Sequence, residues 1–288
     1  MRVGSVETLF RYPVKSMQGE TPASVDLLDK GIEGDRNWAV RDEKRGGISG
    51  AKRFPDLMRF SSTLLEDPSS DGSREAEIVF PDGQRRLSSD PGLAKHISEV
   101  LGQEVTFWPL LPADEVDHYR LGAPVHSDIE TELRAIFGRT DEESLPDLSI
   151  FPPETFQFAS PPGSYYDVYP LHVMTSASLS TLQERAPESV MDVRRFRPSI
   201  LIGDDQSGDS FPEAAWCGKR LGLGEAEIEI ISECPRCVMT THGFEDLAKD
   251  PSVMRTLVRE NNGNLGVYAR PIKRGRIHVG DPVVVLAD

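Results

Sequence analysis

The chain has 288 residues, 38% of them hydrophobic, which is enough for two compact domains or for one domain with a large insertion. Its 47 Asp and Glu against 32 Lys and Arg give a formal net charge of −15. Such a charge repels phosphate backbones, so we expect no nucleic-acid partner, and any anionic ligand needs a local basic pocket.

The sequence predicts neither a secreted nor a membrane protein. The N-terminus lacks an apolar run of signal-peptide length, and no stretch of 18 consecutive apolar residues occurs. Three cysteines are too few, and of the wrong parity, for a disulfide framework in a chain this long. We therefore expect a cytoplasmic protein without membrane contact and with at least one reactive thiolate.

The first part of the chain consists of short β-prone segments separated by turn residues. A hairpin is predicted where residues 78–80 meet the turn Pro81-Asp82-Gly83. A helix is predicted over residues 90–102, with Asp90 as its N-cap and Gly102 as its stop. The other strands expected in this part cover residues 3–9, 24–28, 37–41 and 104–111.

A change of composition follows, because residues 112–166 are acidic and rich in Pro, Gly and Ser, with one helical patch at 130–137. The aromatic residues of this region argue against pure disorder. We expect a linker, or a lid that packs against a site. These aromatic residues are Phe151, Phe156, Phe158, Tyr165, Tyr166 and Tyr169.

The last part again predicts many short strands and few helices. A helix capped by Ser176 is expected over residues 177–185, and a last helix over 251–260. This pattern indicates barrel-like sheets, so the predicted fold class is α+β and mostly β. The expected strands are 171–176, 199–202, 227–232, 266–269 and 276–286.

Cys234-Pro-Arg-Cys237 is the segment that points most directly to chemistry. A zinc site needs four ligands, and Cys217 and His242 lie at spacings that match no common zinc motif. A thioredoxin-like site needs a helix N-terminus, whereas the residues after Cys237 look extended. A further interpretation is that both cysteines are simply buried as small hydrophobic residues.

A single soft thiolate for a soft transition metal is the remaining interpretation. Arg236, between the two cysteines, favours a thiolate, and the hydroxyls of Thr240 and Thr241 follow directly. Residue types alone leave these alternatives open.

The run Cys-Pro-Arg-Cys-Val-Met-Thr-Thr resembles the Cys-x-Arg-Cys-x-x-Thr-Thr signature of MOSC (molybdenum cofactor sulfurase C-terminal) proteins, among them the mitochondrial amidoxime-reducing components. Four other segments match the family in the same order, and five ordered matches are far more specific than one. They are Tyr-Pro-Val-Lys-Ser at 12–16, Gly-Asp-Arg-Asn-Trp at 34–38, Phe-Arg-Pro at 196–198 and Val-Gly-Asp-Pro-Val at 279–283.

This resemblance implies an N-terminal MOSC-associated β-barrel domain at residues 1–112, packed on a MOSC β-barrel domain at 113–288 that includes the loop at 113–166. Molybdopterin is expected between them, with molybdenum ligated by Cys237, which is then also the catalytic residue. Arginine suits the cofactor phosphate because its planar fork bonds bidentately, while lysine acts as a point charge. The predicted cofactor-binding residues are Lys15, Ser16, Arg36, Arg53, Thr175, Ser176, Arg197, Arg236, Thr240 and Thr241.

The function that the resemblance implies is reduction of N-hydroxylated or N-oxide small molecules. The chain has no cysteine after Cys237 for a fused iron–sulfur domain, so electrons are expected from a separate ferredoxin- or flavin-type protein. The alternatives are a carrier of the cofactor or of sulfur that uses the same cysteine, and an interaction protein that binds nothing. Two positions depart from the family pattern: Arg195 replaces a polar amide, and His242-Gly243 replaces Val-Asp.

Overall fold

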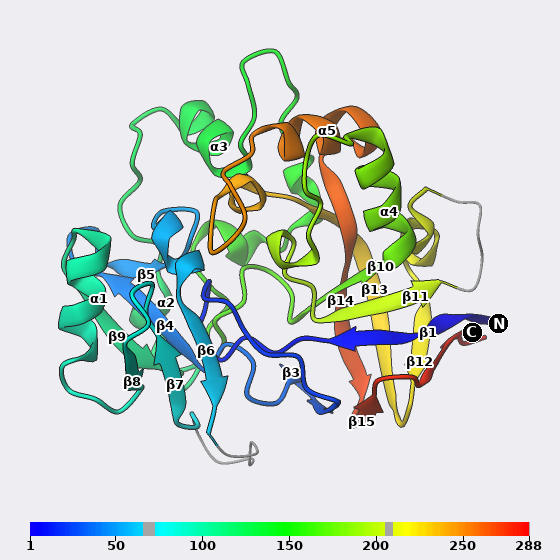
Figure 1. Ribbon diagram of the computed structural model, residues 1–288, viewed down its shortest axis with the longest axis horizontal. Helices are drawn as coiled ribbons and strands as arrows, with labels where there is room; N and C mark the ends of the chain where they lie inside the picture. Colours follow the sequence, from blue (N-terminus) through cyan, green and yellow to red (C-terminus); the bar gives the residue numbers. More distant parts are fainter. Residues whose placement is uncertain (66–72, 205–209, 288) are drawn as a thin grey trace.

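A closed barrel of seven strands dominates the computed structural model, which describes residues 1–65, 73–204 and 210–287 (Figure 1). Its strand order is β1-β11-β10-β14-β13-β12-β16. The barrel strands are β1 (Arg2–Leu9), β10 (Leu171–Thr175), β11 (Ile200–Asp204), β12 (Arg220–Leu223), β13 (Ala226–Pro235), β14 (Asn264–Lys273) and β16 (Pro282–Val285).

Three smaller sheets of three strands each stand beside the barrel, in the orders β15-β2-β3, β5-β4-β9 and β6-β7-β8. The latter two, with helix α1 (Leu93–Leu101), form the left side of Figure 1. Their strands are β2 (Ser24–Leu28), β3 (Gly31–Ile32), β4 (Trp38–Asp42), β5 (Gly47–Ser49), β6 (Ser61–Leu64), β7 (Ala76–Val79), β8 (Arg85–Leu87), β9 (Val105–Pro109) and β15 (Gly275–His278).

The helices are short and lie outside the sheets. No helix among the described residues is both long enough and apolar enough to cross a bilayer. The cytoplasmic location stays a prediction. Besides α1 the helices are α2 (Val116–Tyr119), α3 (Ile129–Phe137), α4 (Ser176–Arg185), α5 (Ser252–Asn261) and the 3₁₀ turns η1 (Pro55–Arg59), η2 (Leu148–Ile150), η3 (Pro153–Phe156), η4 (Val193–Arg195), η5 (Pro212–Trp216) and η6 (Val238–Thr241).

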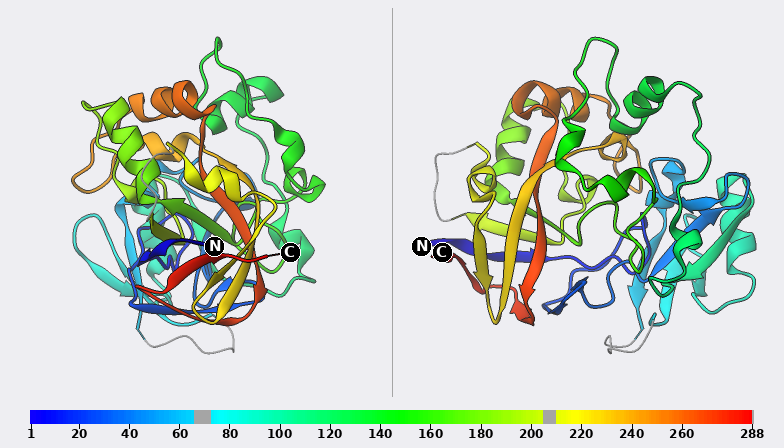
Figure 2. Two further views of the ribbon diagram at one scale, coloured as in Figure 1. Left: turned by 90° about the vertical axis from the view of Figure 1, so that its right-hand side faces the viewer. Right: turned by 180° about the vertical axis from the view of Figure 1, so that it is seen from behind.

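The barrel is closed by the first strand of the chain. β1 pairs antiparallel with β11 and with β16, and the two chain ends lie side by side (Figure 2). Alternate side chains of the barrel strands, such as Val6, Ile202 and Ile228, fill the barrel core, as the period-2 pattern of a half-buried strand requires. The boundary expected at residue 112 stays a prediction.

The predicted fold class, mostly β with a few short helices, is confirmed. Most predicted elements are present, with three local corrections at their ends. Gly92 is the N-cap of α1, while Asp90 accepts a hydrogen bond from its backbone N–H at 2.7 Å. Thr175, not Ser176, caps α4. The strand expected over 276–286 is two strands, separated by a turn around Gly280.

A buried carboxylate, Glu213 of η5, secures the start of α4. It accepts hydrogen bonds from Thr175 Oγ1 at 2.8 Å and from Ser178 Oγ at 2.7 Å. Burial raises the pKa of Glu213, against the opposing effect of these hydroxyl bonds. Because the folded-state pKa is the higher one, the stability from this group is full below the unfolded pKa and is lost as the pH rises through the folded pKa.

We therefore expect Glu213→Gln, which keeps the shape and removes the charge, to become more stable relative to the native chain as the pH rises from about 5 to about 8. The expected gain equals the upward shift of the Glu213 pKa converted at about 1.4 kcal/mol per unit. Urea unfolding of both proteins across this range measures it. A difference that is constant with pH would contradict the assignment.

Candidate functional site

Seven of the predicted site residues meet in one cavity of about 830 Å³. They come from the turn after β1, the segments before β4 and after β5, the loop before β11 and the end of β13. This volume lies within the range usual for small-molecule and cofactor sites. The seven residues are Lys15, Ser16, Arg36, Arg53, Arg197, Arg236 and Cys237.

The two cysteines of the signature differ in their surroundings. Cys237 is half-buried, lines the cavity and forms the N-cap of η6, so the residues after it are helical rather than extended as expected. Cys234 is fully buried on β13, and burial raises the pKa of its thiol. Arg236 donates from Nη1 to Cys234 Sγ at 2.8 Å and from Nη2 to the Phe196 carbonyl at 2.6 Å. The arginine therefore orders the end of β13, and Cys237 is the thiol open to a ligand.

The guanidinium groups of two arginines lie over the ring of Tyr12. The Arg197 guanidinium carbon lies 4.0 Å from the ring centroid and that of Arg36 lies 5.3 Å away. The ring's quadrupole attracts both cations and fixes their positions. Arg36 also pairs with the buried carboxylate of Asp35, which in turn accepts the backbone N–H of Tyr12 at 2.7 Å.

Backbone strain is concentrated at this same place. Ser16, Arg36 and Arg197 have φ angles of 70°, 51° and 53°, in the left-handed region that side chains other than glycine rarely adopt. Each such residue costs about 1–3 kcal/mol and persists only where the surroundings enforce it. All three line the cavity, which makes it the candidate for the functional site.

Arg197 is a cavity residue whose hydrogen bonds are incomplete. It is buried and donates from Nη1 to the Met17 carbonyl at 2.6 Å, whereas Nη2 has no hydrogen-bond partner among the residues that the structure describes. Burial lowers the pKa of Arg197 to about 10. A buried, partly unpaired guanidinium is costly, so this position fits an anionic group such as the phosphate of a cofactor.

Lys15 is already paired inside the protein. Its ammonium group donates to Asp167 at 2.6 Å and to the Tyr165 carbonyl at 2.8 Å, and burial lowers its pKa. Lys52 binds the other oxygen of Asp167 at 2.7 Å. Asp167, which no local sequence pattern marks as a site residue, thus joins two cations at one wall of the cavity.

His172 on β10 is another cavity residue that is absent from the predicted site. Its Nε2 donates to the Leu265 carbonyl at 2.9 Å, and Arg236 Nη1 lies 3.4 Å from Nδ1. Burial, and then the charge of Arg236, hold the pKa of His172 well below its usual range, so the ring is neutral. Within a strand of five buried residues, a polar side chain at position 172 was the available signal.

Four predicted site residues lie outside the cavity. Thr175 is fully buried and bonds Glu213, and Ser176 Oγ lies 3.4 Å from the Ile202 carbonyl. Thr240 and Thr241 are buried, and their hydroxyls donate to the carbonyls of Cys237 and Val238 within η6. They shape the elements next to the cavity, and contact of these four with a ligand stays a prediction.

Arg195, the departure from the family pattern, supports the loop that follows Cys237. It is 2% exposed, and its guanidinium donates to the carbonyls of Val190, His242 and Ala248 at 2.9, 3.0 and 2.8 Å. His242 is also buried and bonds the Ala51 carbonyl at 3.0 Å, and burial lowers its pKa. Both departures therefore act in packing the signature loop.

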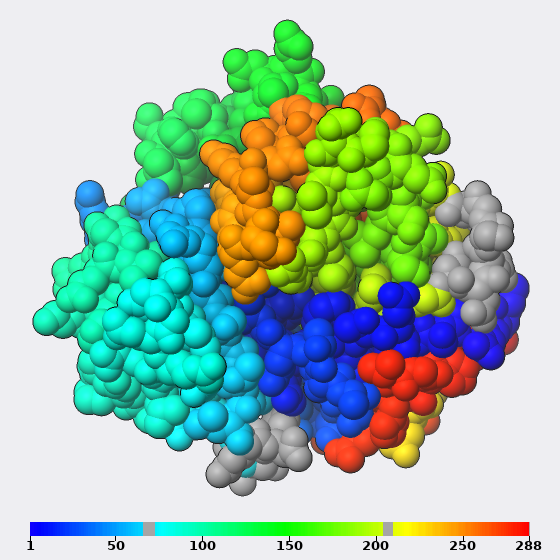
Figure 3. All heavy atoms as spheres, in the orientation of Figure 1, coloured from blue at the N-terminus to red at the C-terminus, as the bar shows by residue number. Residues whose placement is uncertain are grey.

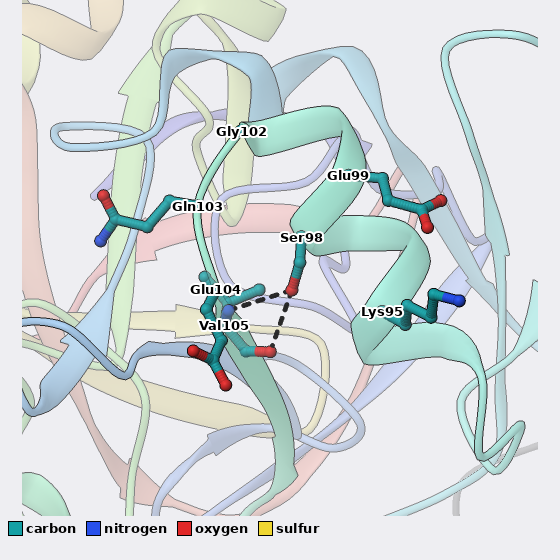
Figure 4. A pocket seen from close by; sticks show the side chains of 7 residues that line it. All are labelled: Lys95, Ser98, Glu99, Gly102, Gln103, Glu104 and Val105. Atoms are coloured by element: carbon teal, nitrogen blue, oxygen red, sulfur yellow. Dashed lines mark hydrogen bonds between the residues drawn. The ribbon is translucent and has the colours of Figure 1, made fainter.

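Two other possibilities find little support. In residues 1–65, 73–204 and 210–287, no group of three or more His, Cys, Asp or Glu side chains is placed to hold a metal, which removes the four-ligand zinc alternative for that part of the chain. A second hollow, of about 540 Å³, lies between α1 and β9 (Figure 4). It contains none of the predicted site residues, and its Ser98 is occupied with the backbone of Val105.

The fold and the cavity define a β-barrel protein with a basic ligand site that one cysteine lines. Residues 3–84 match the MOSC N-terminal beta barrel domain and residues 162–284 match the MOSC domain, together well over half of the chain. The chain belongs to the MOSC family. The MOSC domain is a molybdenum cofactor-binding domain, in agreement with the predicted cofactor.

Several curated proteins are similar over nearly the whole chain. Mitochondrial amidoxime reducing component 2 of Homo sapiens is 28% identical, covering 98% of this chain and 83% of that protein. Mitochondrial amidoxime-reducing component 1 of Danio rerio is 27% identical, covering 98% and 85%. Molybdenum cofactor sulfurase of Drosophila erecta is 23% identical, and the match covers 95% of this chain but 34% of the length of the sulfurase. The solved YUAD protein from Bacillus subtilis aligns with a TM-score of 0.43 at 9% identity, over 98% of this chain and 94% of that one.

Proposed function

We propose that the protein is a molybdenum cofactor-dependent oxidoreductase that reduces small N-hydroxylated or N-oxide compounds. The observation that carries the proposal is Cys237, a half-buried thiol that opens into the same cavity as the incompletely paired Arg197. A soft thiolate and a cationic cradle are what a soft metal on a phosphorylated pterin requires. The similarity to amidoxime reducing components supports the same class of reaction.

Each residue has a separate part in this proposal. Arg197 and Arg36 bind the phosphate, and the ring of Tyr12 holds both guanidinium groups in place through cation–π contacts. Cys237 ligates the metal, and Arg236 fixes the strand end that presents it. The chemistry that the cofactor supplies when bound is two-electron oxygen-atom transfer at a metal. In the net reaction the N–O bond breaks, and two electrons and two protons convert the oxygen to water.

The electrons come from a separate donor protein in this proposal. We expect a donor protein of the ferredoxin or flavin type. The net charge of −15 favours one that docks through a basic face. Steering between opposite charges weakens as salt is added, because the Debye length falls to about 8 Å at physiological ionic strength.

The test is to purify the protein from a host that makes the cofactor and to measure molybdenum, pterin and turnover. We expect stoichiometric metal and repeated reduction of benzamidoxime with reduced methyl viologen as electron source. Bound cofactor that is passed stoichiometrically to another enzyme, without turnover, would instead establish the carrier function that the similarity to molybdenum cofactor sulfurase suggests. Protein without metal or pterin would refute both.

A further inference from the structure

The cavity has a second, apolar wall, which comes from the segment around α3. Four of the exposed large hydrophobic side chains of the molecule lie on this wall: Ile129 is 70% exposed, Phe156 53%, Val125 52% and Leu121 51%. Exposed apolar side chains gathered at one place indicate a binding surface, whereas scattered ones need no explanation. Figures 1 and 3 show this segment in green at the upper edge of the molecule, above the blue residues near position 50.

Helix α3 turns its apolar face toward the cavity instead of toward a core. Ile129, Leu133, Ile136 and Phe137 are spaced by four, three and one residues, which places them on one side of a helix. All four line the cavity, and each of the nine residues of α3 keeps part of its surface exposed. An amphipathic helix is ordinarily stabilised by burying this face, so its place beside the cavity indicates an apolar occupant.

The segment is held in position by contacts at both ends. The Ala123 N–H donates to the Arg45 carbonyl at 2.9 Å, and Glu132 accepts the His126 N–H at 2.9 Å. At the other end a Cβ placed on Gly138 would lie 3.3 Å from the Cα of Val238, the residue after Cys237. The apolar wall is thus an ordered surface that ends next to Cys237.

We propose that this wall is the subsite for the hydrophobic part of the substrate, and that the physiological substrate is an N-hydroxylated compound with an alkyl chain or ring system. This inference rests on the proposed function, since the polar end of the compound lies at Cys237. The basic residues of the cavity suit an anionic cofactor, whereas the exposed apolar side chains of Leu121, Val125, Ile129 and Phe156 suit a hydrophobic group. A hydrophobic chain extending from Cys237 along α3 fits both walls.

The test uses two homologous series with the cofactor-loaded protein. Linear alkanamides from four to ten carbons, which contain no N–O bond, are titrated by calorimetry, and the corresponding N-hydroxyalkanamidines are assayed for reduction. Burial of each methylene against the wall is expected to lower Kd and KM by about two- to fourfold. Since the alkanamides are not reduced, their binding reports on the subsite even if the reductase proposal fails.

A matched pair of variants locates the binding. In Ile129→Ser/Phe156→Ser we expect the dependence on chain length to fall by at least half, whereas Ile272→Ser/Val190→Ser, which alters two exposed apolar residues outside the cavity, keeps it. Affinity that is independent of chain length, or an equal slope in both variants, would overturn the subsite. Turnover of short substrates that persists alongside such a result would leave the proposed function standing.

Discussion

Replacing Cys237 with alanine is expected to abolish molybdenum retention and to lower reductase activity by at least about a hundredfold. Loss of a group that merely supports a metal ligand already costs about 10–100-fold, so loss of the ligand itself costs no less. The fold should survive, because Cys237 is half-buried at a turn between β13 and η6. Metal analysis, together with benzamidoxime turnover on the same preparation, measures the effect.

The chain supplies two control thiols for this experiment. Cys234→Ala removes the other cysteine of the signature, which is buried and bonded by Arg236, and Cys217→Ala removes an exposed one. Both are expected to retain the metal, although Cys234→Ala should lose some stability with its buried contacts. Full metal content in Cys237→Ala, or equal loss in all three variants, would rule out Cys237 as the ligand.

Arg195 and Arg197 are both buried, but replacing each with glutamine is expected to affect different properties: stability at position 195 and cofactor retention at position 197. Arg195→Gln removes a guanidinium whose nitrogens all bind backbone carbonyls, so the protein should lose about 2–4 kcal/mol of stability. Arg197→Gln loses the bond to the Met17 carbonyl and the contact with the Tyr12 ring, but it also relieves the cost of an unpaired buried nitrogen. Because these effects offset each other, the stability of the cofactor-free protein should change by about 1 kcal/mol or less. Chemical unfolding of protein from a host without the cofactor measures both.

Cofactor retention should show the reverse order. Arg197→Gln loses a charge-assisted contact worth about 1.5–3 kcal/mol, so retention is expected to fall by about ten- to a hundredfold. Arg195→Gln should retain the cofactor to the extent that it remains folded. If Arg197→Gln strongly destabilised the cofactor-free protein and left cofactor binding unchanged, Arg197 would be a packing residue and the phosphate site would have to lie elsewhere.

Local sequence patterns were sufficient to predict most of the strands, since alternation of apolar residues is decided within a segment. The ends were harder, because the choice of Thr175 over Ser176 as N-cap depends on Glu213, which lies 38 positions away and accepts the Thr175 hydroxyl. The closing of the barrel by β1 and β16 likewise depends on pairing that no local pattern reveals.

The site was predicted in part, and the omissions have a common cause. The family signatures led to Lys15, Arg36, Arg197 and Cys237, which the fold brings into one cavity. Asp167 was missed because its role arises only when Lys15 and Lys52, more than a hundred positions earlier, reach it.

The pairing of β1 with β16 also bears on how the protein is made. Residues 2–5 find one of their two partner strands among residues 282–284, so the sheet cannot close until these later residues have left the ribosome. Pairing of such distant segments is slow, because a large loss of chain entropy precedes the first contact. The turn that carries Lys15 and Ser16 extends from β1, so the pocket becomes complete only at this late stage. We therefore expect the cofactor to be loaded only after β16 has paired with β1 and closed the barrel.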